Sequence, residues 1–220
     1  VAVFLTYLHN QKNLEENELS KIEKLSFEPQ PIKQFIESCI QNIGKESILF
    51  ISEHGGYYNL PLNYYDDFGL NVPYYFYENL PFNPTKEQIE KQISDYMNEN
   101  LFFCFRNFAD FRRIGYDTEF GCISTKTSIA PDKLVFDLNL PIKVRKEDAT
   151  INLGHFSANL ENSGLGKIIE LNNLILKEQA KNPYSICVSC ILNWTMKSDL
   201  QLFMDRIRNA TILFTVVDNK

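Results

Sequence analysis

The spacing of apolar residues changes near Gly115, and this change constrains the fold more than any other feature of the chain. Before it, apolar residues recur every three or four positions, which is the period of an amphipathic helix. After it, apolar and polar residues alternate over 118–129, 134–144 and 149–160. Alternation is typical of strands with one buried face. The sequence therefore predicts an α+β fold in which helices pack on an antiparallel β-sheet.

Two helices are expected between residue 29 and Gly115. The first covers about 31–51 and follows Pro29 and Pro31, which favour a helix start. The second follows the capping sequence at 83–88 and runs to about Phe103. Beyond the alternating segments we expect a helix over 165–181, a strand over 184–193, a short helix near 198–208 and a closing strand over 212–217. No internal repeat is evident.

The chain opens with eight mostly apolar residues, 1–8, and turns polar at His9. Eight residues cannot span a bilayer, because a spanning helix needs about 20. They are either the outer end of a longer apolar helix or a first turn that packs on the core. Residues 11–25 carry only a thin apolar stripe, as a stalk does. We therefore expect residues 1–28 to form a hydrophobic stalk helix and residues 29–220 an exported α+β head domain.

The composition excludes some partners. The chain has 220 residues, is 44% hydrophobic and carries a net charge of −6. This length and apolar content suffice for a buried core. Nucleic-acid binding needs clustered Lys and Arg side chains, and membrane-surface helices need a basic face. An acidic chain favours neither of these partners.

The five cysteines fit an oxidising compartment with one or two disulfides. Cys39 and Cys104 each lie on the apolar side of an expected helix and are the candidates for a bridge. Cys187 and Cys190 have redox spacing, but in a strand over 184–193 they would face opposite sides and could not bond to each other. Export would also make the sequons at Asn193 and Asn209 glycan acceptors.

No catalytic, cofactor or metal site is predicted. The tripeptide at 67–69 lacks every other kinase motif, the glycines at 164–167 lack the rest of a phosphate loop, and His54 to Gly56 have no nucleophile motif to serve. The three histidines are scattered, without zinc spacing. An exported hydrolase would need carboxylates such as Glu53, Asp66 or Asp67, whose relative positions the sequence does not give.

The segment 57–82 is rich in tyrosine and phenylalanine between three prolines. Short strands or an ordered loop are expected there. Its aromatic side chains either build the core of a loop-rich region or contact another molecule, since tyrosine supplies large contact area at low entropic cost. Sequence alone leaves both interpretations open.

Four segments, 36–40, 53–61, 72–77 and 84–104, together resemble an uncharacterised family of archaeal envelope proteins. Members have one pilin-like N-terminal membrane helix followed by an exported domain. The resemblance covers most of the chain and implies that residues 1–8 end the membrane helix and that Cys39 and Cys104 are paired. This sequence departs from the family by starting inside that helix and by having His54 where Gln is expected.

These observations predict a non-enzymatic, glycosylated structural subunit of the cell surface, anchored in the membrane or assembled into a pilus-like filament. Its expected partners are further copies of itself or other envelope proteins. The alternative is an extracellular module that binds a sugar or peptide through residues 57–82. The candidate contact residues are Val1, Val3, Phe4, Leu5, Leu8, Tyr64, Tyr65, Tyr74, Tyr75 and Tyr77.

Overall fold

A four-stranded antiparallel sheet is centred on β7 (Lys133–Lys146) in this computed structural model, which describes residues 29–67, 70–105, 108–207 and 211–218. β8 (Ala149–Glu161) pairs along one edge of β7. β5 (Asp117–Phe120) and β6 (Ser124–Ile129) pair one after the other along its opposite edge. The predicted antiparallel sheet is confirmed, although the segment expected as one strand over 118–129 is divided in two.

The division of that segment has a local cause. A register shift interrupts the β7–β8 ladder between Asn139 and Ile142, where Pro141 cannot donate a backbone hydrogen bond. The carbonyl of Pro141 accepts instead from the N–H of Gly121, with an N–O distance of 2.7 Å. Gly121 lies between the end of β5 and the start of β6. The register shift in β7 is therefore next to the position where the neighbouring strand is interrupted.

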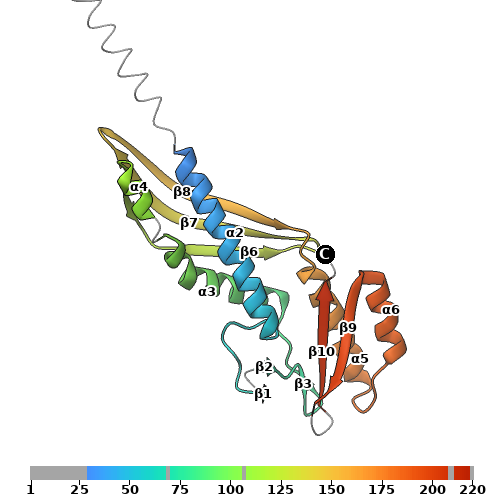
Figure 1. Cartoon of the computed structure of the whole chain (residues 1–220). Coiled ribbons are helices and arrows are strands. Elements are labelled where there is room, and N and C mark those ends of the chain that lie inside the picture. The colour runs from blue at the N-terminus through green and yellow to red at the C-terminus, as the bar shows by residue number, and fades with distance from the viewer. Residues whose placement is uncertain (1–28, 68–69, 106–107, 208–210, 219–220) are drawn as a thin grey trace, which may run out of the picture.

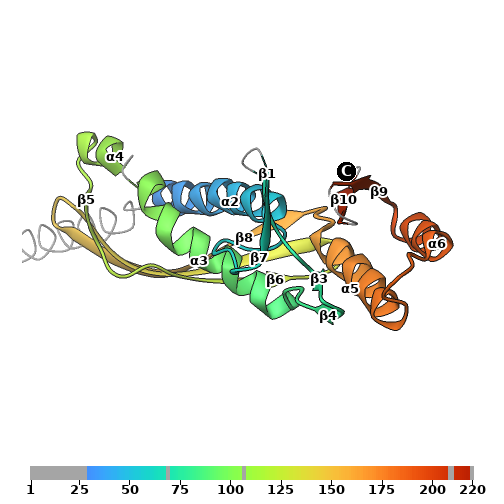
Figure 2. The same ribbon diagram turned by 90° about the horizontal axis from the view of Figure 1, so that it is seen from below.

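One face of the sheet is covered by α2 (Gln30–Glu53) and α3 (Lys86–Phe105), which lie along β8 and β6 respectively (Figures 1 and 2). Both helices were predicted. Apolar side chains from both helices and the sheet form one large core. The alternating residues that β7 contributes to it are Leu134, Phe136, Leu138, Leu140, Ile142 and Val144. The outward face of β7 is mostly exposed and polar.

A second, smaller core lies at the other end of the molecule. α5 (Leu165–Lys181) and α6 (Val188–Ser198) pack with a hairpin of β9 (Leu200–Arg206) and β10 (Ile212–Asp218), at the lower right of Figure 1. Its buried residues are Leu171, Ile175, Ile191 and Leu200. Gly166 lets α5 approach the main sheet, because a Cβ there would lie 2.5 Å from the carbonyl oxygen of Ala130. Residues 29–220, expected as one head, thus contain two hydrophobic clusters.

Two predicted elements are wrong. The expected strand over 184–193 is a loop followed by α6, and the expected helix near 198–208 is β9. The apolar run 186–192 is short and contains β-branched residues, so its spacing does not distinguish a strand from a helix. In the structure Ile191 and Thr195 are buried one helical turn apart. Asp199, with a left-handed φ of 58°, ends α6 and starts β9.

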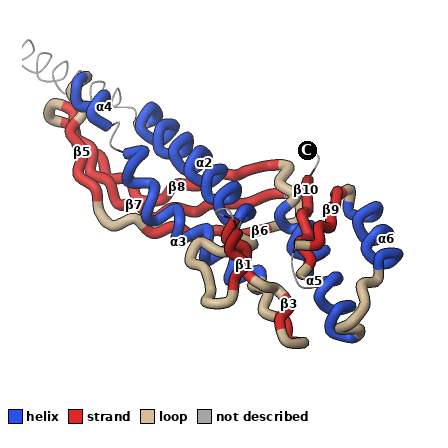
Figure 3. The backbone as a smooth tube through the Cα atoms, turned by 60° about the horizontal axis from the view of Figure 1, so that its bottom comes forward, coloured by secondary structure: helices blue, strands red, loops and turns tan. Residues whose placement is uncertain are grey.

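The aromatic segment forms two small hairpins, as Figure 3 shows for β1 and β3. They consist of β1 (Tyr64–Asp67) with β2 (Leu70–Pro73), and β3 (Phe76–Tyr77) with β4 (Leu80–Pro81). The short strands expected there are present. A single-turn helix, α4 (Ala109–Arg113), connects α3 to β5.

The expected stalk helix over 1–28 lies outside the described residues. Within the part of the chain that the structure describes, no helix combines the length and the apolar content that crossing a membrane requires.

Gly44 sets the distance between α2 and the sheet. A Cβ at this position would lie 2.6 Å from the ring of Phe136, whose side chain is fully buried. We expect Gly44→Ala to lower the free energy of unfolding, because overpacking costs about 1–3 kcal/mol and exceeds the gain in helix propensity of about 1 kcal/mol. Urea denaturation measures the difference. Gly154→Ala is the matched control, since a Cβ there meets nothing within 4 Å; an equal effect at both glycines would contradict this account.

Candidate functional site

The structure contains two disulfides. The first joins Cys39 of α2 to Cys104 of α3, with an S–S distance of 1.98 Å, and is the pair expected from the sequence. Cys39 is 1% exposed, so this bond lies inside the main core. It closes a loop of 65 residues. Chain entropy gives such a loop a stabilisation of about 4 kcal/mol, which makes this disulfide a structural element.

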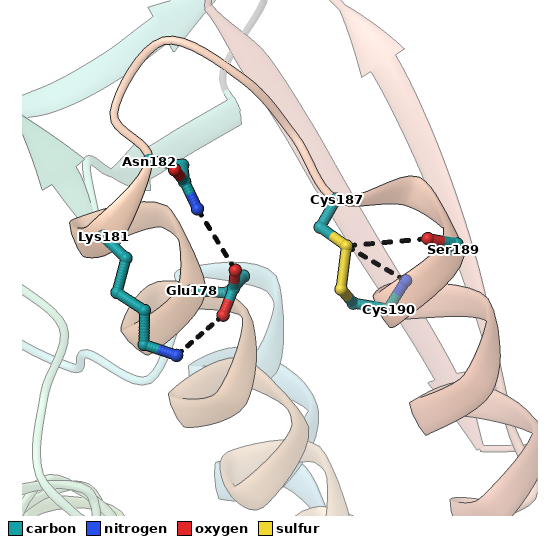
Figure 4. The surroundings of a disulfide bond; sticks show 6 residues. All are labelled: Glu178, Lys181, Asn182, Cys187, Ser189 and Cys190. Atoms are coloured by element: carbon teal, nitrogen blue, oxygen red, sulfur yellow. Dashed lines mark hydrogen bonds and ion pairs between the residues drawn. A yellow bond between two sulfur atoms is a disulfide. The ribbon is translucent and has the colours of Figure 1, made fainter.

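The second disulfide joins Cys187 to Cys190, and the prediction that these two could not bond to each other is wrong. The prediction assumed a strand, whereas α6 begins at Val188 and brings both sulfurs to one side of its first turn (Figure 4). Only three residues separate the two cysteines. The chain-entropy stabilisation from so short a loop is about 2 kcal/mol, and both cysteines are partly exposed. This bond therefore contributes less to folding than the first.

Cys187 occupies the N-cap position of α6. Its Sγ accepts a hydrogen bond from the backbone N–H of Cys190 at 3.3 Å and lies 3.7 Å from the hydroxyl oxygen of Ser189 (Figure 4). A helix N-terminus carries a partial positive charge and unsatisfied N–H groups, both of which stabilise a thiolate. Redox-active cysteine pairs occupy this position at a helix N-terminus, and Cys187 and Cys190 lie there.

A small cavity of about 10 Å³ borders Cys187 and separates it from α5. Glu178 and Trp194 are among the residues that line it. A hydrogen bond from Lys181 at 2.9 Å, supported by one from Asn182 at 3.3 Å, lowers the pKa of Glu178 and keeps its carboxylate charged (Figure 4).

Cys122 is the only free cysteine among the described residues. It is exposed and lies between β5 and β6. The structure therefore accounts for all five cysteines as two bonded pairs and one accessible thiol.

The candidate tyrosines do not share one environment. The hydroxyl of Tyr75 donates a hydrogen bond to the carbonyl of Gly55 at 2.8 Å, and burial raises the pKa of Tyr75. Tyr75 therefore anchors the segment to the end of α2. Tyr64 and Tyr77 are exposed, while Tyr65 and Tyr74 are half-buried. The rings of Tyr74 and Tyr77 lie 5.5 Å apart. Tyr75 thus fits the interpretation that the aromatic residues build a local core. The exposed Tyr64 and Tyr77 are left for contact with another molecule.

His54 has a structural role. Its Nδ1 lies 2.7 Å from the carbonyl oxygen of Phe50, and the two rings stack at 4.3 Å. Gly55 and Gly56 both have positive φ and turn the chain after α2. Gly164 is similarly explained by packing, because a Cβ there would lie 2.3 Å from a carboxylate oxygen of Asp218. The residues 54–56 and Gly164 therefore have structural roles, in ending a helix, turning the chain and allowing close packing.

A shallow depression of about 420 Å³ lies on the sheet face opposite the helices. The polar side chains that line this depression come from neighbouring positions on β6, β7 and β8. They include both hydrogen-bond donors and hydrogen-bond acceptors. The alternation of the strands predicted a polar face but not a hollow, which lies beside the register shift of β7. The polar residues that line it are Ser124, Lys126, Asp137, Asn139, His155 and Ser157.

The remaining candidates are not assembled into a site by the described residues. Glu53 and Asp66 line neither the small cavity nor the shallow depression. The side chain of Asp67 is not among those that the structure describes. No cluster of three metal-ligating side chains occurs within the described ranges. Asn193 is exposed on α6, but the hydroxyl of Thr195 in its sequon is buried against Ile191. Outside the described residues lie Asn209, Val1, Val3, Phe4, Leu5 and Leu8.

The Tyr75 hydrogen bond generates a testable expectation. Tyr75→Phe should lower the free energy of unfolding by about 1 kcal/mol, measured by urea denaturation at pH 7. The folded protein holds the Tyr75 proton more tightly than the unfolded chain, whose pKa is near 10.0. Stability should therefore be intact below pH 10 and fall as the pH rises above it, with a smaller fall in the variant. The exposed Tyr77 gives the control Tyr77→Phe, and equal losses in the two variants would contradict the assignment.

Comparison of the chain with protein-family models, with curated proteins and with solved structures finds no match in any of the three. The support for a function therefore comes from the residues and geometry described above.

Proposed function

We propose that this protein is a structural subunit of the cell envelope that works without catalysis, held at the membrane or in a filament by residues 1–28 and exposing residues 29–220 as its head. The observation that carries the proposal is the presence of two disulfides in one described chain. Disulfides form and persist in oxidising compartments and are rare in the cytosol.

The surface of the head supports a role in assembly. Apolar side chains are exposed together on and around the hairpins that follow α2, and such patches mark contacts with other proteins or with membranes. The half-buried Tyr75 holds these hairpins in place, since its carbonyl accepts from the N–H of Phe82 at 2.7 Å and its hydroxyl donates to Gly55, and the exposed side chains are left for lateral contacts with other subunits. The most exposed members of the patch are Leu62, Tyr64, Tyr77, Leu80 and Phe82.

Thiol counting tests the compartment. We expect one of the five cysteines, Cys122, to react with an alkylating reagent when the native protein is denatured without reductant, and all five to react after reduction, as read by intact mass. The protein should also fractionate with membranes or surface filaments in its native host. Serine substitutions at Phe4 and Leu5 should release it, whereas Leu49→Ser, an exposed position on α2, should not. Five free thiols, or a soluble monomer throughout, would refute the proposal.

The alternative function is an extracellular binding module for a sugar or peptide. The partly exposed ring pair of Tyr74 and Tyr77 favours it, because sugars and peptides stack on such rings. Tyr77→Ala should abolish binding on a glycan or peptide array without lowering the melting temperature. Lys126→Ala, at an exposed position on the outward face of the sheet, is the control. An array on which the unmodified head binds nothing would eliminate this alternative and leave the structural role.

A further inference from the structure

The edge of the main sheet formed by β6 is closed by side chains of α3. Three outward N–H groups of β6 each donate a hydrogen bond to a polar side chain of this helix. These bonds run from Thr125 to Asn98, from Thr127 to Ser94 and from Ile129 to Glu90, at 2.7, 2.9 and 2.8 Å. A further strand cannot pair with this edge unless these bonds break.

The opposite edge of the sheet, formed by β8, is open. β8 pairs with β7, and within the described residues no hydrogen bond from another element reaches its outer edge, the upper one in Figure 1. Edge strands are commonly short or carry Lys or Pro, which discourage pairing. β8 has 13 residues and contains no Lys, Arg or Pro. It is therefore suited to the addition of another strand.

The register of the sheet shows which backbone groups of β8 point outward. The residues of β6 that donate to α3 lie opposite Leu134, Phe136 and Leu138, so the backbone groups of these β7 residues point the other way, toward β8. Their partners on β8 are Leu160, Ala158 and Phe156. Backbone groups alternate between the two edges of a strand, so the outward ones in this part of β8 belong to residues 155, 157, 159 and 161.

We propose that this edge pairs with the same edge of a second copy of the chain, antiparallel over residues 155–161 and centred on Ala158. A two-fold axis makes such a contact self-complementary, because both copies contribute the same residues. The inference rests on the assembly role proposed above and names a surface through which two copies meet. It lies on the sheet and is separate from the hairpins that follow α2.

Charge and side-chain type favour this register. Centring on Ala158 places His155 opposite Glu161 of the second copy at both ends, so an imidazole meets a carboxylate twice. Phe156 then lies opposite the second copy's Leu160, and no like charges meet. Centring the pair on Ser157 instead would place Glu161 opposite the apolar Leu153.

The backbone groups fit the same register. The outward residues of one copy face the outward residues of the other, and each facing pair can exchange two hydrogen bonds. The pairs are 155 with 161, 157 with 159, 159 with 157 and 161 with 155. The irregularity in the β7–β8 ladder lies before this segment, between Asn139 and Ile142 on β7, so 155–161 is uninterrupted.

The first test measures association of the full chain by sedimentation. All proteins carry Phe4→Ser and Leu5→Ser, so that residues 1–8 do not drive association. We expect a dimer whose dissociation constant rises at least tenfold with His155→Glu, which places like charges opposite each other, and returns to within threefold when Glu161→Lys is added. Ser124→Glu, exposed on β6 two strands away, is the control and should have no effect. A monomer at every concentration, or a dimer indifferent to His155→Glu, would overturn the pairing.

The second test removes one outward N–H group. Ser157→Pro deletes the N–H that points away from β7, and proline is tolerated on an edge strand in this position. We expect the variant to keep its circular dichroism spectrum and to lose the dimer, whereas Ser157→Ala, which keeps the N–H, should dimerise like the parent chain. A folded Ser157→Pro variant that still dimerises would contradict backbone pairing at this edge.

The third test reads the register by cross-linking in a Cys122→Ser background, which removes the free thiol of the described residues. A mixture of Ser157→Cys and Asn159→Cys chains should form disulfide-linked pairs under mild oxidation at least fivefold faster than either chain alone, because these residues face each other. Ser157→Cys mixed with Asn152→Cys is the matched control. Equal rates in the two mixtures would overturn the register.

The outcomes separate this contact from the envelope role. A dimer broken by Leu62→Ser and Tyr77→Ser, but not by His155→Glu, would identify the hairpins as the interface and overturn pairing through β8. A chain that shows two disulfides by thiol counting and fractionates with membranes, yet does not dimerise through β8, would overturn this inference alone. Five free thiols would refute the envelope role whether or not the edges pair.

Discussion

The burial of one face of β7 is the constraint on which the rest of the structure depends. Six apolar side chains alternate along this strand and are almost fully buried. Both long helices of the main core lie on that face, and the absence of a side chain at Gly44 allows α2 to reach Phe136. The opposite face is free to be polar and carries the shallow depression. A single alternating sequence thus determines where the core lies and which surface faces solvent.

The two disulfides divide the cysteines by role. The Cys39–Cys104 bond spans distant parts of the sequence inside the main core, where reagents have little access. The Cys187–Cys190 bond spans one helical turn at the surface of the small core, beside charged and apolar side chains. Loop length and burial give the first bond a large effect on folding, whereas the second closes a short loop and is partly exposed. Both bonds are consistent with the oxidising compartment on which the proposed envelope role depends.

Sequence patterns predicted the elements in which the spacing of apolar residues repeats over enough positions to be unambiguous. α5 was expected over 165–181 and has these bounds, and β7 and β8 follow their alternation. The apolar run 186–192 was too short to distinguish a strand from a helix. The strand prediction placed Cys187 and Cys190 on opposite faces, whereas the structure bonds them to each other. One wrong element therefore concealed the second disulfide. The depression and the inward direction of Tyr75 depend on cross-strand pairing and on Gly55, which the spacing of residues does not encode.

The Cys39–Cys104 bond also has a mechanical consequence. If residues 1–28 tether the head, tension enters the described fold at the N-terminal end of α2. Only residues 30–38 can unwind before the load reaches Cys39, where the covalent bond transfers it to α3 and, through the packing of α3, to β6. Tension from the N-terminal side cannot extend residues 40–103 unless the covalent bond breaks, because these residues lie inside the loop that the disulfide closes. The Cys39–Cys104 bond thus limits the part of α2 that tension from the N-terminal side can unwind.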